Sequence, residues 1–257
     1  NPNIINTEGF VDSMRDKETL ETELALKDLE TLEKRLSSVE RDVKAGVKGA
    51  MEERNALQKA KALLEQGKTL YDATWGSNPQ VTQGGFSEAE REILKQYSFL
   101  TSKPRLFALN ASSGEAAPWV EKFRAQGIAA FALDVLGEFE SAGFSPDERE
   151  ALGLSRESGL DILTQKAYEL LGLITFLTTG PDETRAWTIR RGIRAPQAAG
   201  AIHSDFEKKF IRADAIQWDK LVEAGGFAKA REKGWIRTEG KEYVVEDGDV
   251  LEIKHGA

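Results

Sequence analysis

Two groups of basic residues near the carboxyl end of the chain could contact a phosphate backbone. The first group is Arg190, Arg191 and Arg194, and the second group is Lys229, Arg231 and Lys233. Trp187 and Trp235 lie close to these groups in sequence and offer flat rings on which unpaired bases could stack. The alternative is that both groups are solvated basic tips offset by neighbouring Asp and Glu, and the sequence leaves both interpretations open.

The composition excludes several kinds of chemistry. The chain has no cysteine, which excludes a disulfide scaffold, a thiol nucleophile and a thiolate metal site. With only two histidines, His203 and His255, we expect no histidine metal cluster. No paired acid and nucleophile accompany them, so we expect His203 to be a structural hydrogen-bonding residue and His255 to be uninformative.

The charge balance argues against a general polyanion binder. The net charge is −8, and residues 180–257 hold 14 Lys and Arg against 14 Asp and Glu, so the excess acid lies upstream. High affinity for nucleic acid requires many Lys and Arg that release phosphate counterions. We therefore expect no DNA binding, although local basic groups could still contact RNA.

Length and termini suggest a multidomain chain that belongs to something longer. At 257 residues, two or more units are expected. No apolar run is long enough for a membrane helix and nothing resembles a signal peptide, so we expect a cytoplasmic protein without a membrane partner. The chain starts with Asn1 rather than Met, which suggests that it begins inside a longer reading frame.

The first third of the chain has the pattern of a helical hairpin. Apolar residues spaced alternately by three and four positions predict a helix from Arg15 to Lys44 with a narrow apolar seam; they are Leu29, Leu32, Leu36, Val39 and Val43. Gly46 and Gly49 interrupt the pattern before a second predicted helix from Ala50 to Tyr71. We expect an antiparallel coiled-coil pair, which is either a plain structural arm or an arm that docks a partner.

The middle of the chain predicts a strand, helix, strand unit. The Gly- and Asn-rich residues 75–86 predict a loop, and Ser87 with Glu90 predicts a capped helix that ends near Tyr97. A buried strand over residues 105–109, a helix over 118–126 and a second strand over 128–133 then predict two parallel strands joined by a crossover. Because two strands do not make a stable parallel sheet, we expect the isolated chain to melt without sharp cooperativity.

The pattern changes near Leu173. Ser145 with Glu148 predicts a helix start, and residues 159–172 predict a helix with five apolar side chains turned inward: Leu160, Leu163, Ala167, Leu170 and Leu171. Beyond it, the short β-like runs 173–178 and 184–189 predict a hairpin with a turn at 180–182. We place a domain boundary near Leu173.

Several motifs resemble one family. Arg185-Ala-Trp-Thr-Ile189, Ala195-Pro-Gln-Ala-Ala-Gly200, Ile202-His-Ser-Asp-Phe-Glu207 and Phe210-Ile-Arg-Ala213 occur in this order, and Glu239-Gly-Lys-Glu-Tyr-Val-Val-Glu-Asp-Gly-Asp-Val250 closes the run. Together they resemble the C-terminal TGS module of the YchF-type (Obg-like) ATPases, P-loop proteins of the translation-factor class. Upstream, Glu21-Thr-Glu-Leu-Ala-Leu-Lys-Asp-Leu-Glu30 resembles the start of the family's helical domain.

The resemblance implies an α+β multidomain fold. Its expected parts are a G-domain remnant at 1–14, a helical coiled-coil hairpin domain at 15–100, the C-terminal part of the α/β G domain at 101–172, and a β-grasp TGS domain at 173–257. Within the last part we expect a helix over 197–206, a tight turn at Asp247-Gly248 and a final strand over 250–253.

The resemblance also implies a function, for which this sequence lacks one required motif. The family binds and hydrolyses ATP in preference to GTP, uses Mg²⁺ and associates with the ribosome or ribosomal RNA through its TGS module. This chain has no Gly-x-x-x-x-Gly-Lys-Ser/Thr loop, so we expect it to be inactive alone and to bind neither ATP nor Mg²⁺ tightly. Non-catalytic docking and a degenerate paralogue that lost the ATPase are the alternatives.

Single positions depart from the family pattern. Asn110 and Ala111 match the start of the base-recognition motif Asn-x-x-Glu and are the expected adenine contacts, but Ser113 stands where the acid belongs and Glu115 is the nearest acid. The loop that closes over the base should lie near residues 132–134, without its usual small residues. Asn6 occupies the position of a family His and cannot shuttle a proton near neutral pH, so no catalytic residue is expected.

Overall fold

A computed structural model of the chain describes residues 12–74, 85–180 and 182–256. The chain divides into two compact units between Ile162 and Leu163, inside the helix α9 (Gly159–Leu171), and each unit is described by itself. Within the described ranges, no helix combines the length and the apolar composition that a membrane span requires.

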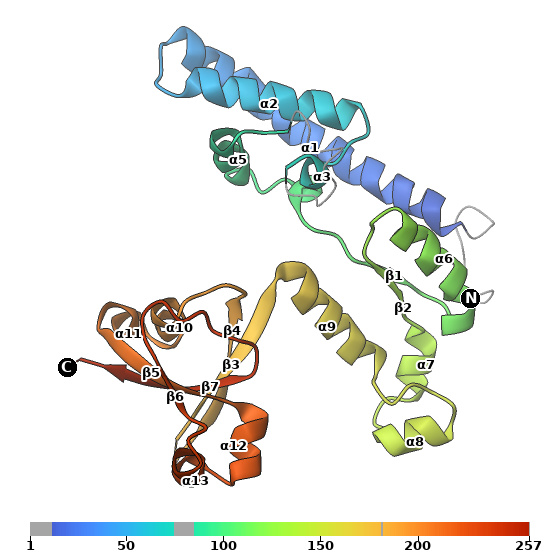
Figure 1. Cartoon of the computed structure of the whole chain (residues 1–257). Helices are drawn as coiled ribbons and strands as arrows, with labels where there is room; N and C mark the ends of the chain where they lie inside the picture. The colour runs from blue at the N-terminus through green and yellow to red at the C-terminus, as the bar shows by residue number, and fades with distance from the viewer. Residues whose placement is uncertain (1–11, 75–84, 181, 257) are drawn as a thin grey trace. The chain divides into compact units, whose positions relative to one another are not determined.

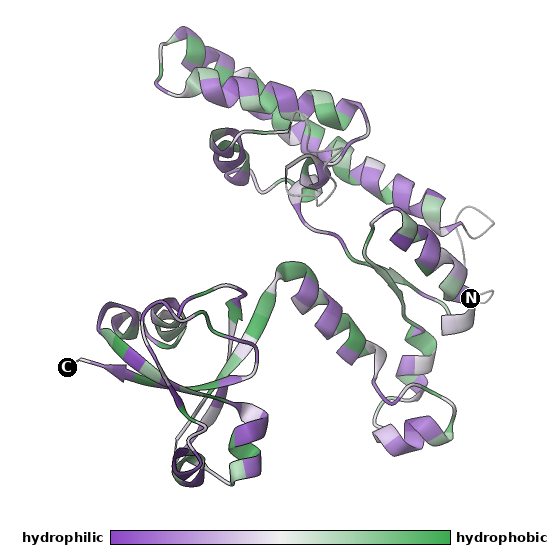
Figure 2. Ribbon diagram, viewed as in Figure 1, coloured by the Kyte–Doolittle hydropathy of each residue, from purple (hydrophilic) through white to green (hydrophobic). Residues whose placement is uncertain are grey.

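The first unit begins with the predicted pair of antiparallel helices, α1 (Ser13–Lys44) and α2 (Ala50–Glu65) (Figure 1). Asp12 caps α1 by accepting hydrogen bonds from the first backbone N–H groups. The turn between the helices uses Gly46 and Gly49 at φ +72° and +84°, which glycine adopts without a steric cost. Leu32 and Val39 of the predicted seam are fully buried, while the outward faces are hydrophilic (Figure 2).

The prediction of one helix up to Tyr71 was wrong. Helix α2 ends at Glu65, because Gly67 takes the left-handed conformation at φ +71° and its N–H donates to the carbonyl of Leu64 at 2.9 Å. A short helix, α3 (Leu70–Thr74), follows. The predicted loop lies mostly outside the described residues, since the description resumes at Gly85.

The capped helix predicted at Ser87 is present as α5 (Glu88–Lys95), with both hydrogen bonds of the capping box. The 3₁₀ helix η1 (Leu100–Ser102) follows and is fastened to α1 by the buried carboxylate of Asp28. Asp28 accepts from the N–H of Leu100 at 2.9 Å and from the N–H and hydroxyl of Thr101 at 2.8 and 2.7 Å. This one side chain therefore holds the end of the helical region against α1.

The predicted crossover is confirmed: β1 (Phe107–Leu109) and β2 (Ala130–Ala132) are parallel and flank α6 (Ser113–Ala125). Two details differ. Helix α6 begins at Ser113 rather than near Pro118, because Ser112 caps it; Pro118 lies inside the helix, where it removes one backbone hydrogen bond. Strand β1 is half-exposed rather than buried, since β1 and β2 form a sheet of two strands in the described residues.

After β2, the chain forms α7 (Val135–Glu140), α8 (Pro146–Ala151) and α9. The helix start predicted at Ser145 is confirmed by a complete capping box with Glu148. The inward placement predicted for all five apolar residues of α9 was wrong for two of them, because Leu160 is 66% exposed and Leu171 is 51% exposed. The apolar stripe of this helix is therefore covered only in part.

The second unit contains a mixed sheet of five strands in the order β4-β3-β7-β5-β6 (Figure 1). The strands are β3 (Leu173–Thr179), β4 (Thr184–Arg190), β5 (Phe210–Gln217), β6 (Arg237–Glu239) and β7 (Asp249–His255). The central strands β3 and β7 are parallel, and the other neighbours are antiparallel. The predicted hairpin is thus present as β3 and β4.

Helices cover both faces of this sheet. Side chains alternate between the faces of a strand, so Ala215 and Leu251 pack with α10 (Ala195–Ile202) on one face. Ile216 and Val250 pack on the other face with α12 (Trp218–Ala224) and α13 (Phe227–Glu232). The sheet therefore has an apolar core on each side.

The helix predicted over 197–206 is two helices. It starts earlier, at Ala195, and it is interrupted at His203, whose backbone is extended at φ −157° and ψ 138°. The Nδ1 atom of His203 accepts from the N–H of Asp205 at 3.2 Å and so caps α11 (Ser204–Lys208). The turn predicted at Asp247-Gly248 is confirmed by the φ of +82° at Gly248.

Candidate functional site

The candidate nucleotide-contact residues lie where the two parallel strands end. Asn110 follows β1 directly and is exposed, and the N–H of Ala111 donates to the carbonyl of Leu109 at 2.9 Å. The side-chain oxygen of Asn110 accepts from the N–H of Val135, the first residue of α7, at 3.2 Å. This bond fixes the orientation of the amide and leaves its NH₂ group as a donor for a ligand.

The acid nearest to the expected recognition position serves a helix cap. The N–H of Glu115 donates to the hydroxyl of Ser112 at 3.4 Å, and that hydroxyl donates to the Glu115 carboxylate at 3.0 Å. Ser113 is the first residue of α6 and carries no charge. At the end of β1, the described residues therefore present the neutral amide of Asn110, while the carboxylate of Glu115 is engaged in the cap of α6.

The expected base-closing loop also has a structural role. The N–H of Leu133 donates to the carbonyl of Leu109 at 2.9 Å and continues the pairing of the two strands. Asp134 caps α7 by accepting from the N–H of Gly137 at 3.0 Å. Asn6, the remaining nucleotide-related position, lies outside the described residues.

The first basic group is spread over a strand end, a turn and a helix cap. Arg190 ends β4, Arg191 lies in the following turn, and Arg194 precedes α10. The guanidinium of Arg194 pairs with Glu242 at 2.7 Å, so part of its charge is neutralised. Both partners are exposed, and such a pair contributes at most about 1 kcal/mol, so a phosphate could displace Glu242.

The second basic group lies on α13 and at its end. Arg231 is paired with Asp214 at 3.5 Å and with Glu252 of β7 at 3.9 Å. The Lys233 ammonium lies 4.2 Å from the centre of the Trp235 ring, which is a cation–π contact. Lys229 forms no ion pair with a residue that the structure describes. The three cations therefore differ in how freely they can meet a phosphate.

The structure does not join the two basic groups into one surface. The strand registers place Glu252, the contact of Arg231, about six residues along the sheet from Arg190, which is roughly 20 Å. Figure 1 agrees, because α13 and the end of β4 lie at opposite ends of the sheet. A ligand that contacts both groups must span the sheet.

Two aromatic features were not predicted. Arg185 lies over the ring of Trp187 at 4.4 Å, and the indole N–H donates to the hydroxyl of Thr178 at 2.8 Å, so this ring is held in place. The spacing of two residues along one strand face could have indicated the pair. His255 was expected to be uninformative, but it stacks on Phe206 with centroids 4.3 Å apart.

The described ranges hold no group of three or more His, Cys, Asp or Glu side chains placed to bind a metal ion.

Comparisons with known proteins agree with the motifs. The family model YchF-GTPase_C, described as a protein of unknown function (DUF933), matches residues 173–256. The ribosome-binding ATPase YchF of Bacillus subtilis is 41% identical over 98% of this chain and 69% of its own length. Obg-like ATPase 1 of Saccharomyces cerevisiae is 35% identical over 99% of this chain and 66% of its own.

A solved structure agrees as well. The YchF GTPase of Schizosaccharomyces pombe superposes with a TM-score of 0.74 and 30% identity, and the match covers 99% of this chain and 69% of that one. Similarity in sequence and fold thus extends over nearly the whole chain. The chain belongs to the YchF-type (Obg-like) family of ribosome-binding ATPases.

Proposed function

We propose that this chain supplies the base-contact and ribosome-docking parts of a YchF-type ATPase whose phosphate-binding residues lie outside these 257 residues. In this proposal, 15–100 is the helical coiled-coil arm, 101–172 is the C-terminal part of the G domain and 173–257 is the β-grasp TGS domain. The alternating helix and strand pairing around β1 and β2 and the mixed sheet of the second unit support this division.

The stretch of this sequence that most resembles a phosphate-binding loop is incomplete, which supports the proposal that the phosphate site lies elsewhere. Gly67-Lys68-Thr69 has the end of a P-loop motif, but position 62 is Ala rather than Gly. The hydroxyl of Thr69 is buried and donates to the Asp72 carboxylate at 2.5 Å, so it is not presented to a magnesium ion. We propose that ATP hydrolysis in a longer protein uses ATP and Mg²⁺ held elsewhere.

A surface for further parts of the G domain is available in the first unit. Exposed apolar side chains are frequent in α7 and in the stretch that follows it up to α9; Phe139 and Leu152, for example, are 80% and 63% exposed. Apolar groups at this density usually mark a surface that another segment covers. We propose that additional strands and helices of the G domain pack here and beside the half-exposed β1 and β2.

For nucleotide contact, we propose Asn110 and Ala111 as the residues that meet the adenine. The free NH₂ group of Asn110 can donate to a ring nitrogen of the purine, and the backbone of Ala111 lines the same strand end. This donor alone suits adenine and guanine, because both present an acceptor nitrogen at the corresponding ring position. The preference for ATP therefore needs further contacts.

For docking, we propose that the two basic groups contact ribosomal RNA in the cytoplasm. The relatives named ribosome-binding support this partner. Arg190 and Lys229 form no ion pair in the described residues, and Trp187 and Trp235 provide rings close to cations. The observation that carries the proposal is the combination, on the second unit, of these cations with half-buried indole rings.

Co-sedimentation with ribosomes over a salt series tests docking. We expect binding that weakens steeply as salt rises, because each phosphate contact releases counterions. Binding that is independent of salt would contradict the basic contacts. In parallel, the purified chain should release no phosphate from ATP, and release by material free of contaminating enzymes would disprove the missing phosphate site.

A degenerate paralogue without ATPase activity is the second candidate. It is favoured by Ser113 at the acid position and by the engagement of Glu115 in the cap of α6. A reading frame extended upstream of Asn1 decides between the candidates. An in-frame phosphate-binding loop with ATP binding by the longer protein supports the first, whereas a longer protein that does not bind ATP in a titration supports the second.

A further inference from the structure

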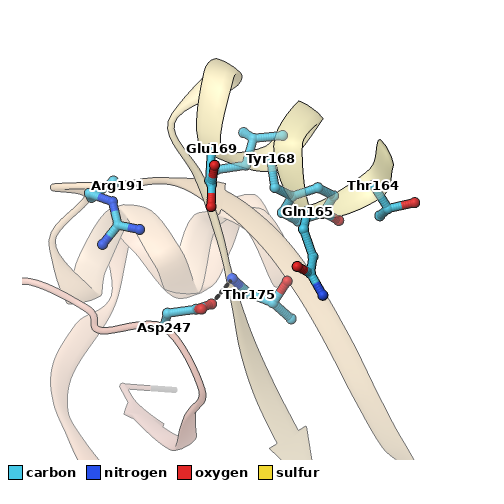
Figure 3. Close-up of a pocket in the computed structure, with 8 residues that line it drawn as sticks. Thr164, Gln165, Tyr168, Glu169, Thr175, Arg191 and Asp247 are labelled. Carbon is cyan, nitrogen blue, oxygen red and sulfur yellow. Dashed lines mark hydrogen bonds between the residues drawn. The ribbon is translucent and has the colours of Figure 1, made fainter. Parts of the chain in front are cut away.

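A cavity of about 470 Å³ opens beside the start of β3 in the second unit (Figure 3). Its walls come from one face of α9, the start of β3, the turn after β4 and the turn before β7. The residues that matter for its chemistry are Gln165, Tyr168, Glu169, Thr175, Arg191 and Asp247. Cavities of this size accept small molecules.

Hydrogen bonds hold the wall of the cavity near β3, and they use only one carboxylate oxygen of Asp247. The N–H of Thr175 donates to one carboxylate oxygen of Asp247 at 2.7 Å, and the N–H of Gly248 donates to the carbonyl of Thr175 at 2.8 Å. The second oxygen of Asp247 accepts no hydrogen bond from the described part of the chain. Asp247 therefore has a fixed position and an unused acceptor.

The other walls are fastened in the same way. The backbone N–H of Arg191 donates to the carbonyl of Gly172 at 2.7 Å, which fixes the turn. Its guanidinium forms no hydrogen bond with the residues that the structure describes. The hydroxyls of Tyr168 and Thr188 lie 3.0 Å apart in a hydrogen bond that ties α9 to β4. The cavity is thus bounded by anchored segments.

Charges of both signs face this space. Arg191 forms no ion pair with any residue in the described ranges, and Asp247 and Glu169 border the same cavity (Figure 3). Glu169 is paired with Lys166 at 2.9 Å, but both side chains are exposed and the pair is weak. A ligand here meets one cation and two carboxylates.

We propose that this cavity binds a free amino acid, with its carboxylate on the Arg191 guanidinium and its ammonium group on the unused oxygen of Asp247. A polyanion is disfavoured because two carboxylates line the cavity, and a simple cation is disfavoured by the guanidinium. An apolar ligand would find one aliphatic lining side chain, Leu173. A zwitterion satisfies both signs at once, and the hydroxyl of Thr175 and the amide of Gln165 suit a polar side chain.

Binding is measured on the full chain by saturation-transfer NMR and isothermal titration, with L-serine and L-glutamine as probes. Acetate and ethylamine, which each carry one of the two charges, are the comparison probes. We expect the amino acids to bind saturably and each comparison probe to bind at least about tenfold more weakly. Equal binding of acetate, or no binding of either amino acid at about 10 mM, overturns the proposal.

Asp247→Asn tests the ammonium contact. It keeps an oxygen for the Thr175 N–H but removes the charge, so we expect amino-acid affinity to fall at least about tenfold. The control Glu223→Gln changes an exposed acid on α12 that does not line the cavity, and it should bind like the original chain. Unchanged affinity in Asp247→Asn overturns the proposal.

Two further measurements separate this inference from other effects. If Asp247→Asn melts earlier, its affinity is measured at a temperature at which the melting curve shows the variant fully folded, and unchanged affinity there overturns the proposal. Ribosome co-sedimentation of Asp247→Asn should be unchanged, so the loss of amino-acid binding is distinct from a failure of docking. Arg191 stays unaltered in these experiments because it also belongs to the proposed RNA contact.

Discussion

The side chain of Asn110 bonds to the backbone of Val135 across 3.2 Å, and this bond ties the end of β1 to the start of α7. A residue proposed to contact a purine thus also organises the loop beyond the neighbouring strand. Its two roles use different atoms, because the oxygen accepts from Val135 while the NH₂ group stays available.

The first prediction concerns this division of roles. Asn110→Ala should loosen the start of α7, because the N–H of Val135 loses its acceptor at a net cost of about 1 kcal/mol. Asn110→Asp keeps the acceptor and removes the donor. Hydrogen exchange at Val135 should therefore accelerate in Asn110→Ala and remain slow in Asn110→Asp; equal acceleration in both variants would show that the bond does not matter.

The second prediction concerns the buried carboxylate that fastens η1 to α1. Asp28→Ala leaves two backbone N–H groups and the Thr101 hydroxyl without their acceptor, and should destabilise the first unit by about 3 kcal/mol. Urea unfolding measures this loss. Glu23→Ala removes an exposed acid from the same helix and should change stability by less than about 0.5 kcal/mol. A similar effect in both variants would argue against the anchor.

The third prediction is a pH dependence carried by Glu53. Two hydrogen bonds from Arg35, at 2.6 and 2.9 Å, are the largest cause that lowers the pKa of this carboxyl below its ordinary value of 4.5, and the hydroxyl of Tyr97 also donates to it. The folded chain therefore binds this proton less readily than the unfolded chain. Its contribution to stability is complete above the unfolded pKa and is lost as pH falls through the lower folded value.

Urea unfolding near pH 7 and near pH 3 tests this sign with Glu53→Gln as the comparison. The original chain should lose more stability between the two pH values than the variant, because the variant has no proton to bind at this position. An equal loss in both proteins would remove Glu53 as a source of the acid sensitivity.

The fourth prediction ranks the basic residues by their partners. Arg190→Ala and Lys229→Ala remove cations without an ion pair in the described residues, and each should lower the salt slope of ribosome binding by about one. Arg194→Ala should have a smaller effect because Glu242 already offsets that charge. Lys241→Ala, outside both groups, is the control. If Lys241→Ala weakens ribosome binding as much as Arg190→Ala and Lys229→Ala do, the proposed phosphate contacts of Arg190 and Lys229 are wrong.

Much of the fold could be predicted because its signals are local. Capping residues such as Ser87 and Ser145 and the glycines at 46, 49 and 248 act within a few positions of the backbone they shape. The misplacements have other causes. His203 interrupts a run with helical periodicity by capping the next helix with its own ring, and a residue-type pattern does not indicate that choice.

The candidate site was harder to predict because charge depends on partners distant in sequence. Arg231 looks like one of three equivalent cations, but Asp214 and Glu252 come beside it only when the sheet forms. No sequence pattern indicated a role for Arg149, yet this side chain is buried. It pairs with Glu138 at 2.8 Å and donates a hydrogen bond to Ser141. Leu160 and Leu171 fit the apolar periodicity of α9, but periodicity alone does not indicate which apolar side chains other residues bury.

The fully buried carboxylate of Asp249 accepts hydrogen bonds from three segments. The amide of Gln217 on β5 donates at 2.9 Å and the guanidinium of Arg237 on β6 donates at 3.2 Å. From the segment before β7, the hydroxyl of Tyr243 donates at 2.6 Å and the N–H of Glu246 at 3.0 Å. Burial, first among the causes, raises the pKa of Tyr243, so this phenol keeps its proton and remains a donor over the physiological range. The turn that contains Asp247 is consequently rigid before any ligand arrives. Ligand binding at this turn therefore costs little conformational entropy. A small molecule can bind there with useful affinity through few contacts.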